Sequence, residues 1–315
     1  MKKIFIGIIA LQLITYIFAT AQTVPVPNKG RYSFNFKGTY FEVDPKSGGR
    51  ISSFKIKNKE LLYTDTTGKN NNWGSTFWPA PQSVWGWPPH DTLDSSPYSA
   101  SVKSGVLTIK SMDKKQGLHC RFEKIFRMNE ADQCVSVTYK IVNTGKVADT
   151  LGPWQITRIP SGGLTFFPKG LSLAKGKLLP LMKDINDVSW FVYDSAYISK
   201  DPTAVPKLFS DGTEGWIAHV NKDRNLIVFR FEDTPVEQKS PGEDEIEIYT
   251  NPNLTYTEVE PLGPYKIIPA GQSHSWTVKW YARKVPANIV IKQGSQELAK
   301  FVRVVIGTAR ETVRK

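Results

Sequence analysis

A chain of 315 residues, 40% of them hydrophobic, is long enough to bury a sizeable core, and it carries a formal net charge of +12. Its basic residues are scattered, with no run of five or more Lys or Arg, so the charge does not indicate a nucleic-acid-binding protein. The sequence also contains no P-loop, dinucleotide-binding fingerprint, HExxH motif or GxSxG motif, and we therefore expect no nucleotide cofactor.

The first segment has the three parts of a secretory signal peptide. Lys2 and Lys3 precede an apolar run over residues 4–18, and an Ala-x-Ala cleavage pattern ends at Ala21. The apolar run is too short and too interrupted for a retained membrane helix, so we expect cleavage near Ala21 and no stable membrane insertion. The mature chain, residues 22–315, is then secreted or periplasmic.

Loss of the two lysines takes the net charge from +12 to +10, so the mature chain stays basic. A basic exported protein favours an acidic polysaccharide or a cell surface as its partner. Solvated strand faces account for the same charge without any such partner.

From residue 31 onward the chain alternates apolar and polar residues with period two, in short runs separated by turn residues. The expected strands cover residues 32–36, 40–44, 50–56, 100–102, 106–111, 117–128, 133–143, 150–159, 164–167, 171–179, 215–220, 225–231, 245–249, 255–260 and 275–282, with a looser region over residues 183–210. The pattern shows no internal repeat and no linker. It therefore predicts one domain with an all-β antiparallel sandwich.

One aromatic stretch, residues 70–89, interrupts this pattern. It holds four of the nine tryptophans, interleaved with four prolines and two glycines. Proline has no N–H for a sheet ladder, so we expect a long shaped loop rather than a central strand. Its rings either form a stacking platform for a sugar or close the end of the core. The candidate binding side chains here are Trp73, Trp78, Gln82, Trp85 and Trp87.

The two cysteines, Cys120 and Cys134, are not expected to pair. Residues 117–128 and 133–143 read as the arms of one hairpin, which separates the cysteines by on the order of 25 Å along the ladder. A disulfide needs Cα atoms within about 7 Å. Two cysteines alone make no metal site, and the acidic cluster at residues 243–247 lacks a calcium-loop pattern. We expect solvated charge there, and no metal.

Only the C-terminal end has a helical pattern. Ser295 is a suitable N-cap, and Leu298, Val302 and Val305 recur at helical spacing. We expect a helix over about residues 295–310 whose apolar stripe packs on the sandwich. A membrane-surface role is less favoured, because few basic residues accompany the stripe.

Several segments of the chain, in the right order, resemble those of galactose mutarotase-like domains. Residues 48–62 resemble the glycine turn, strand and Gly-x-Glu-Leu-Leu segment of these domains, and residues 73–79 resemble their segment that ends in Phe-Pro. Residues 256–261 and 269–273 resemble their later Val-Glu-Pro and Pro-Gly-Glu-Ser strands. The chain looks most similar to a secreted bacterial branch of this superfamily. The resemblance implies an antiparallel β-supersandwich that binds sugar on a concave face.

The resemblance also implies an activity. Mutarotases interconvert sugar anomers with a glutamate base and a histidine acid, and Glu260 matches the position of the base. The mid-chain histidine is absent, since the nearest local match ends in Arg158, which suits a carboxylate or an oxyanion but cannot act as a neutral-pH acid. His90 is the one histidine beside the aromatic stretch and is the candidate acid. Glu258, two residues before Glu260, shares its strand face.

Three functions are compatible with these residues. The first is an exported sugar epimerase, and the second is a glycan-binding protein without catalysis, which the missing histidine favours. The third is a structural envelope protein whose tryptophans only fill the core. The partner in the first two is a sugar or a polysaccharide, and the sequence indicates no oligomeric state.

Overall fold

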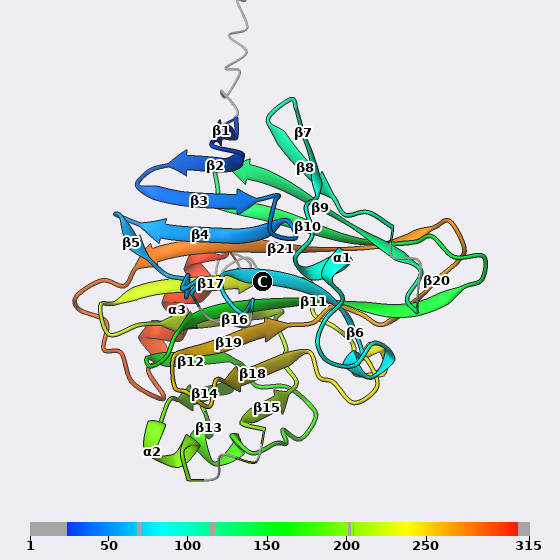
Figure 1. Cartoon of the computed structure of the whole chain (residues 1–315). Coiled ribbons are helices and arrows are strands. Elements are labelled where there is room, and N and C mark those ends of the chain that lie inside the picture. Colours follow the sequence, from blue (N-terminus) through cyan, green and yellow to red (C-terminus); the bar gives the residue numbers. More distant parts are fainter. Residues whose placement is uncertain (1–23, 68–70, 114–116, 201–202, 204, 308–315) are drawn as a thin grey trace, which may run out of the picture.

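Two large antiparallel sheets form the body of the protein (Figure 1). The computed structural model describes residues 24–67, 71–113, 117–200, 203 and 205–307. The first sheet has eleven strands, with the path β1(Val26–Asn28), β2(Arg31–Phe36), β3(Thr39–Asp44), β4(Arg50–Ile56), β6(Ser75–Ala80), β11(Asp149–Pro160), β19(Tyr256–Pro261), β18(Ile246–Thr250) and β15(Lys207–Ser210). Off this path, β5(Lys59–Glu60) pairs with β4 and β20(Lys266–Ile268) with β11.

The second sheet has ten strands and lies against the first. Its order is β13(Met182–Ile185), β14(Val188–Val192), β12(Leu164–Pro168), β16(Trp216–Val220), β17(Asn225–Arg230), β21(Ser273–Lys284), β10(Cys134–Asn143), β9(Cys120–Asn129), β8(Val106–Lys110) and β7(Ser99–Lys103). The all-β antiparallel architecture predicted from the alternating pattern is thereby confirmed.

Helices are few among the described residues. They are α1(Asp91–Asp94), α2(Ser195–Ile198) and α3(Gln296–Val305), with single 3-10 turns η1(Gln82–Val84), η2(Leu179–Leu181) and η3(Val236–Gln238). In this part of the chain no helix has the length and apolar character needed to cross a bilayer. Residues 1–23, which include the expected signal peptide, lie outside the described residues.

The main core lies between the two sheets. Phe41 and Phe54 of the first sheet pack edge-on against Trp280 of the second, with ring centroids 5.5 and 5.7 Å apart. Gln155 joins the sheets by hydrogen bonds, since its Oε1 accepts from the Tyr139 hydroxyl at 2.9 Å and from Trp280 Nε1 at 3.1 Å. All five side chains are buried, so each sheet gives one face of its period-two pattern to this layer.

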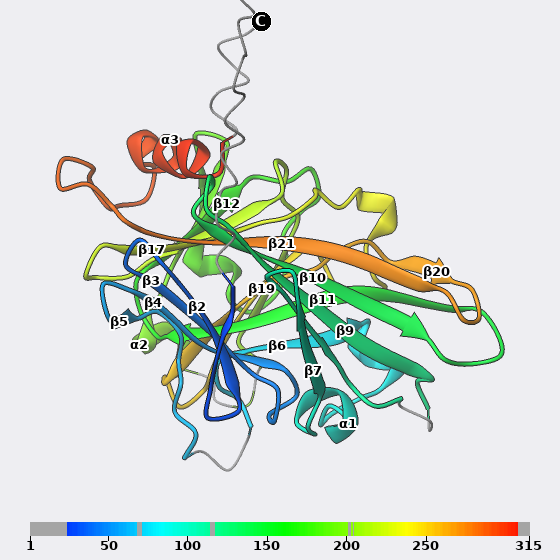
Figure 2. The same ribbon diagram turned by 90° about the horizontal axis from the view of Figure 1, so that it is seen from above.

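The predicted C-terminal helix is confirmed, and it covers the outer face of the ten-stranded sheet. Leu298 and Val302 of α3 are buried with outer-face side chains such as Trp216. Ser295 is the N-cap, because its Oγ accepts the N–H of Leu298 at 3.3 Å. Figure 2 shows α3 on one side of the paired sheets and α1 on the other. The expected helical residues beyond 307 lie outside the described residues.

The hairpin that separates the two cysteines is also confirmed. Strands β9 and β10 place Cys134 opposite Asn129 and Cys120 opposite Asn143. The two buried thiols therefore lie at opposite ends of a ten-residue ladder, beyond the reach of a disulfide.

The expectation that residues 70–89 form no central strand is wrong. Residue 70 lies outside the described residues, but Ser75–Ala80 form β6, between β4 and β11. Pro79 is tolerated there because it lies opposite Pro153, so neither position needs a ladder donor. The Pro79 carbonyl instead accepts from Trp85 Nε1 at 2.7 Å.

Residues 171–179 form no strand, contrary to the expectation from their apolar pattern. Within this stretch only Lys175 makes an isolated bridge, to Phe209. Leu171 and Leu173 are 85% and 95% exposed, and the N–H of Leu171 donates to Asp211 Oδ2 at 2.7 Å. Leu178 is buried in the core, but Leu171 and Leu173 are left without a layer to pack on, so the period-two pattern is not realised as a strand.

Candidate functional site

Five neighbouring strands of the eleven-stranded sheet, β6, β11, β19, β18 and β15, present one face away from the core. The register aligns side chains across this face: Arg158 lies opposite Glu258, and Glu260 lies opposite Glu247. Lys207 on β15 lies opposite Tyr249, at the end of the row that holds Arg158 and Glu258, and Glu260 and Glu247 belong to the adjacent row on the same face. Residues far apart in the chain thus meet because the strands are neighbours.

A cavity of about 350 Å³ opens on this face, and we call it the Glu260 cavity. Its lining residues are Asn72, Trp78, Gln82, Trp87, Trp154, Val205, Lys207, Tyr249, Asn251, Tyr256, Glu258 and Glu260. Small-molecule sites generally range from about 300 to 1,000 Å³, so one small ligand fits. Aromatic rings beside a few polar groups suit a sugar, whose C–H faces stack while its hydroxyls take hydrogen bonds.

Glu260 has only 1% of its surface exposed and lies opposite Glu247, in the row next to that of Lys207. Its Oε2 accepts from Trp154 Nε1 at 2.9 Å and lies 3.4 Å from Lys207 Nζ. Its buried Oε1 has no hydrogen-bond partner among the described residues, so it can accept a hydrogen bond from a ligand. Burial raises the pKa of Glu260 to about 7, although Lys207 acts in the opposite direction.

Lys207 lies between two buried carboxylates. Its Nζ is 2.5 Å from Glu247 Oε2 and 4.7 Å from the centroid of the Trp154 ring. Burial lowers the pKa of Lys207, but Glu260 and Glu247 outweigh burial and raise it above the ordinary lysine value. Lys207 therefore stays charged at neutral pH and stabilises negative charge in the cavity.

Arg158 lies behind the cavity wall and holds Glu258 at the surface of that wall. The guanidinium is fully buried, and its Nε is 2.8 Å from Glu258 Oε1. It also donates to Thr76 Oγ1 at 3.2 Å and to Asn72 Oδ1 at 3.4 Å. Glu258 and Asn72 line the cavity while Arg158 does not, so Arg158 orients lining residues.

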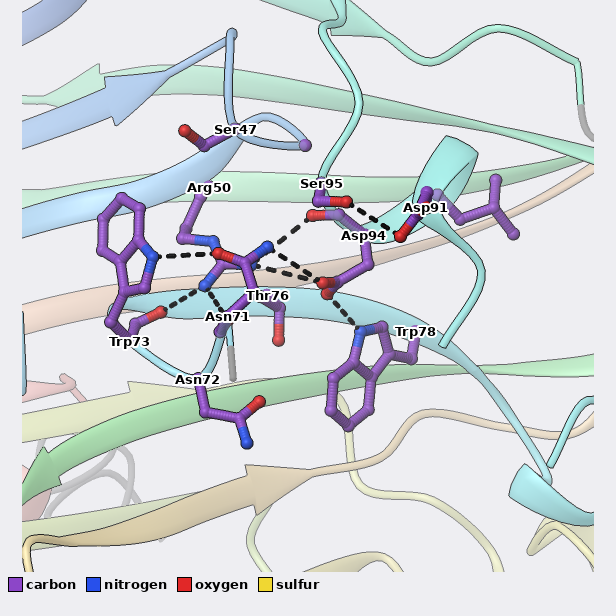
Figure 3. Close-up of polar contacts among 12 residues, drawn as sticks. Ser47, Arg50, Asn71, Asn72, Trp73, Thr76, Trp78, Asp91, Asp94 and Ser95 are labelled. Carbon is purple, nitrogen blue, oxygen red and sulfur yellow. Dashed lines mark hydrogen bonds and ion pairs between the residues drawn. The ribbon is translucent and has the colours of Figure 1, made fainter. Parts of the chain in front are cut away.

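Asp94 on α1 ties a ring of the cavity wall to the sheet (Figure 3). Its Oδ1 accepts from Trp78 Nε1 at 2.8 Å, and its Oδ2 lies 3.4 Å from Arg50 Nη2. Arg50 is fully buried, donates to the Trp73 carbonyl at 2.9 Å and stacks on the Trp73 ring at 4.7 Å. This network fixes the orientation of Trp78 from behind.

Trp78 is the centre of a tryptophan cluster. Its ring meets those of Trp154, Trp85 and Trp87 edge-on, with centroid separations of 5.7, 5.7 and 5.8 Å. Trp73 and Trp78 are buried, Trp85 is half-buried, and Trp87 is 58% exposed. Of the tryptophans in the aromatic stretch, Trp78 and Trp87 line the Glu260 cavity, and Trp73 packs beneath Arg50 instead.

Gln82 also lines the Glu260 cavity, and its backbone N–H donates to Glu243 Oε1 at 3.0 Å. His90, by contrast, lines a separate cavity of about 210 Å³ together with Trp85 and Trp78. His90 is the N-cap of α1, where its Nδ1 accepts the N–H of Thr92 at 3.2 Å. The structure therefore brings Glu258, Glu260 and Gln82 into one cavity and places His90 in its neighbour.

The acidic cluster at residues 243–247 is not solvated, so that expectation is wrong. Glu245 is 1% exposed and Glu247 fully buried. Glu245 accepts backbone N–H groups of Thr234 at 2.6 Å and Gly212 at 3.0 Å, and burial raises its pKa to about 8. Glu247 lies on β18 and Glu245 directly precedes this strand, and both side chains are buried, which the sequence pattern did not show. Within the described ranges no three His, Cys, Asp or Glu residues are arranged to hold a metal ion.

Sequence reasoning missed several residues of this site, namely Asn72, Asp94, Trp154, Lys207, Glu247 and Tyr249. One signal was present: Trp154, Ile156 and Arg158 alternate with the core residues Gln155 and Thr157. Lys207 carried no such signal, because it lies in the region expected to be loose.

No family model matches the chain. No curated protein matches it either. Solved structures do resemble it in fold. A galactose mutarotase-related enzyme from Lactobacillus acidophilus has a TM-score of 0.58 at 9% identity, over 82% of this chain and 98% of its own. A galactose mutarotase-like protein from Lactobacillus casei has a TM-score of 0.57 at 12% identity, over 81% and 100%.

A candidate aldose 1-epimerase from Escherichia coli K12 gives a similar match, with a TM-score of 0.55 at 12% identity over 81% of this chain and 99% of its own. At such low identity these matches show the fold alone. The chain has the galactose mutarotase-like fold that its sequence motifs implied.

Proposed function

We propose that the Glu260 cavity binds a sugar and that Glu260 acts as the base in the interconversion of its anomers. The observation that carries this proposal is the buried carboxylate of Glu260, with a pKa of about 7 and an unpartnered oxygen, on the wall of a cavity lined by tryptophans. A base with a pKa near the working pH both takes and returns a proton readily. The fold, shared with proteins described as galactose mutarotase-like or galactose mutarotase-related, agrees with this chemistry.

In the proposed reaction Glu260 removes the proton of the anomeric hydroxyl, C1–O1 becomes a carbonyl and the C1–O5 bond breaks. O5 takes a proton from a water molecule, which leaves hydroxide, and the C1–C2 bond rotates. On ring closure O5 returns its proton to this hydroxide as it attacks C1, and Glu260 returns its proton to O1. The Lys207 ammonium stabilises negative charge on Glu260 and on the developing oxyanion. Trp87 and Trp78 supply ring faces against which the sugar is held.

One observation favours glycan binding without catalysis as the second candidate. No histidine lines the Glu260 cavity in the described part of the chain, and Lys207 holds its proton too tightly to replace one. A protein that only binds would use Glu260 and Glu258 as hydrogen-bond acceptors for sugar hydroxyls. The two functions differ in whether replacing Glu260 changes the rate of anomer exchange or only the affinity for the sugar.

Anomer-exchange NMR on a panel of common aldoses, with wild type and Glu260→Gln, separates them. If Glu260 is the base, the variant should lower kcat by at least about 100-fold with little change in affinity, because the amide keeps the contact. If the protein only binds, the affinity alone should change, by about 1–3 kcal/mol. The matched control is Glu237→Gln, an exposed glutamate outside the cavity. An exchange rate and an affinity both equal to wild type would remove Glu260 from the site.

We further propose that the protein acts in the periplasm or outside the cell. The support is the signal-peptide pattern of residues 1–21, since lysines, an apolar run and a small-residue cleavage site occur in the order that secretion requires.

A further inference from the structure

We propose that the Glu260 cavity selects neutral and amino sugars and rejects acidic ones. This inference rests on the proposed function and names its substrate class. It runs against the expectation from the whole chain, whose net charge of +12 favours acidic partners.

Both cations of the described residues that lie in or directly behind the cavity wall, Lys207 and Arg158, are already paired with carboxylates. Lys207 is bound to Glu247 at 2.5 Å and to Glu260 at 3.4 Å. Arg158 is bound to Glu258 at 2.8 Å. A uronate or a sugar phosphate would therefore have to break one of these pairs to find a partner, and it would leave a buried carboxylate unpaired.

The carboxylates around the cavity also outnumber the cations. Glu243, Glu247, Glu258 and Glu260 lie in or directly behind the wall, against Lys207 and Arg158. Two more lysines lie near Glu243, but Lys175 and Lys239 are both bound to Asp244, at 3.3 and 2.5 Å. Glu260, with a pKa of about 7, is only partly ionised at neutral pH, but Glu243, Glu247 and Glu258 still outnumber the two cations. The cavity thus presents a negative potential to its ligand, even though the protein as a whole is basic.

Among the described lining residues, the one buried side-chain atom without a hydrogen-bond partner is an acceptor. Glu260 Oε1 is buried without a hydrogen-bond partner in the described structure, so it requires a ligand that donates. A sugar hydroxyl donates to it, and an ammonium donates with the added attraction of opposite charge. A ligand carboxylate has no proton to donate at neutral pH and is repelled.

The first test compares sugars that differ only in charge. The probes are D-glucose, D-glucosamine and D-glucuronate, together with the three galactose counterparts, titrated by NMR at low ionic strength. We expect the amino sugar to bind at least as tightly as the neutral sugar, and the uronate about tenfold more weakly, equivalent to roughly 1.4 kcal/mol. Tighter binding of the uronate overturns the inference and leaves the proposed function standing. Failure of all six sugars to bind overturns the proposed function, and this inference with it.

The second test measures the sign of the cavity's charge without any sugar. Trp87 lines the cavity and is 58% exposed, whereas the other tryptophans are buried, apart from the half-buried Trp85. The difference in fluorescence between wild type and Trp87→Phe therefore reports on the cavity mouth. Its quenching by caesium and by iodide is measured at low salt, relative to N-acetyltryptophanamide.

We expect the relative quenching of Trp87 by caesium to exceed that by iodide at least about twofold, because a negative potential attracts the cation. Glu260→Gln should lower this ratio. Trp85→Phe, which removes the neighbouring ring and keeps the cavity carboxylates, should leave it unchanged. A preference for iodide at Trp87 contradicts the negative cavity and overturns the inference.

Discussion

At the scale of single residues, burial decides the chemistry of this protein more than residue type does. Two of its histidines show this. His119 is exposed beside β9, whereas His219 on β16 is 5% exposed, and its Nδ1 lies 3.0 Å from Thr165 Oγ1. Burial lowers the pKa of His219 to about 3, so it is neutral in the folded protein at every physiological pH.

His219 should make the protein sensitive to acid. Between pH 6.5 and about 3 the unfolded chain protonates this histidine and the folded chain does not, so stability falls as the pH falls through this window. From pH 7 to pH 5 the loss due to His219 should be about 2 kcal/mol, measured by urea unfolding. His219→Gln should lose less stability over the same interval. His119→Gln is the matched control and should follow wild type; equal pH dependence in all three proteins would assign the acid sensitivity to other groups.

At the scale of elements, the short helix α1 acts on the cavity through one side chain. Asp94 closes α1, binds Arg50 of β4 and accepts from Trp78 of β6. A four-residue helix has little stability of its own, so its position depends on these contacts. The cavity wall is thereby attached to two strands and a helix at once.

Asp94→Asn should destabilise the fold strongly. The amide keeps the shape of the carboxylate but leaves the charge of Arg50 buried without a counter-charge, at a cost of about 3–5 kcal/mol. Chemical unfolding measures the loss. Asp91→Asn, an exposed aspartate on the same helix, is the control and should stay within about 0.5 kcal/mol of wild type. Similar losses in both variants would show that Asp94 does not hold Arg50.

At the scale of the whole molecule, the outer faces of the two sheets differ in what lies on them. The helix α3 covers part of the outer face of the ten-stranded sheet (Figure 2). The outer face of the other sheet carries the Glu260 cavity. When a helix packs on the outer face of one sheet of a sandwich, the outer face of the other sheet can still bind a ligand.

The full chain, produced in a Gram-negative host with residues 1–21 intact, should be recovered from the periplasm with Gln22 as its first residue. Intact mass measurement checks this, because signal peptidase removes the segment after a small-residue pattern. Ala21→Arg, which spoils that pattern, should retain the segment. Recovery of the uncleaved wild-type chain from the cytoplasm would contradict export.

The sequence by itself determined the all-β fold, the main hairpin and the C-terminal helix. These depend on local periodicity and on caps such as Ser295, which can be read directly along the chain. The motif around Glu260 also indicated the sheet face of the candidate site, because Glu258 and Glu260 lie two residues apart on one strand. The missing N–H of Pro79 predicted a loop rather than a strand. A strand forms nevertheless, because the residue opposite Pro79 on the next strand is also a proline.

Only the tertiary structure decided what surrounds Glu260. Lys207, Glu247 and Trp154 come from three other strands, and strand order is a long-range property that a local pattern does not contain. The same applies to His90, which adjoins the aromatic stretch in sequence and yet lines a different cavity. The distribution of charge shows most clearly what the sequence alone does not determine. The sum over the chain is positive, whereas four glutamates and two cations, Lys207 and Arg158, lie in or directly behind the described wall of the Glu260 cavity, because folding brings these side chains together from different strands.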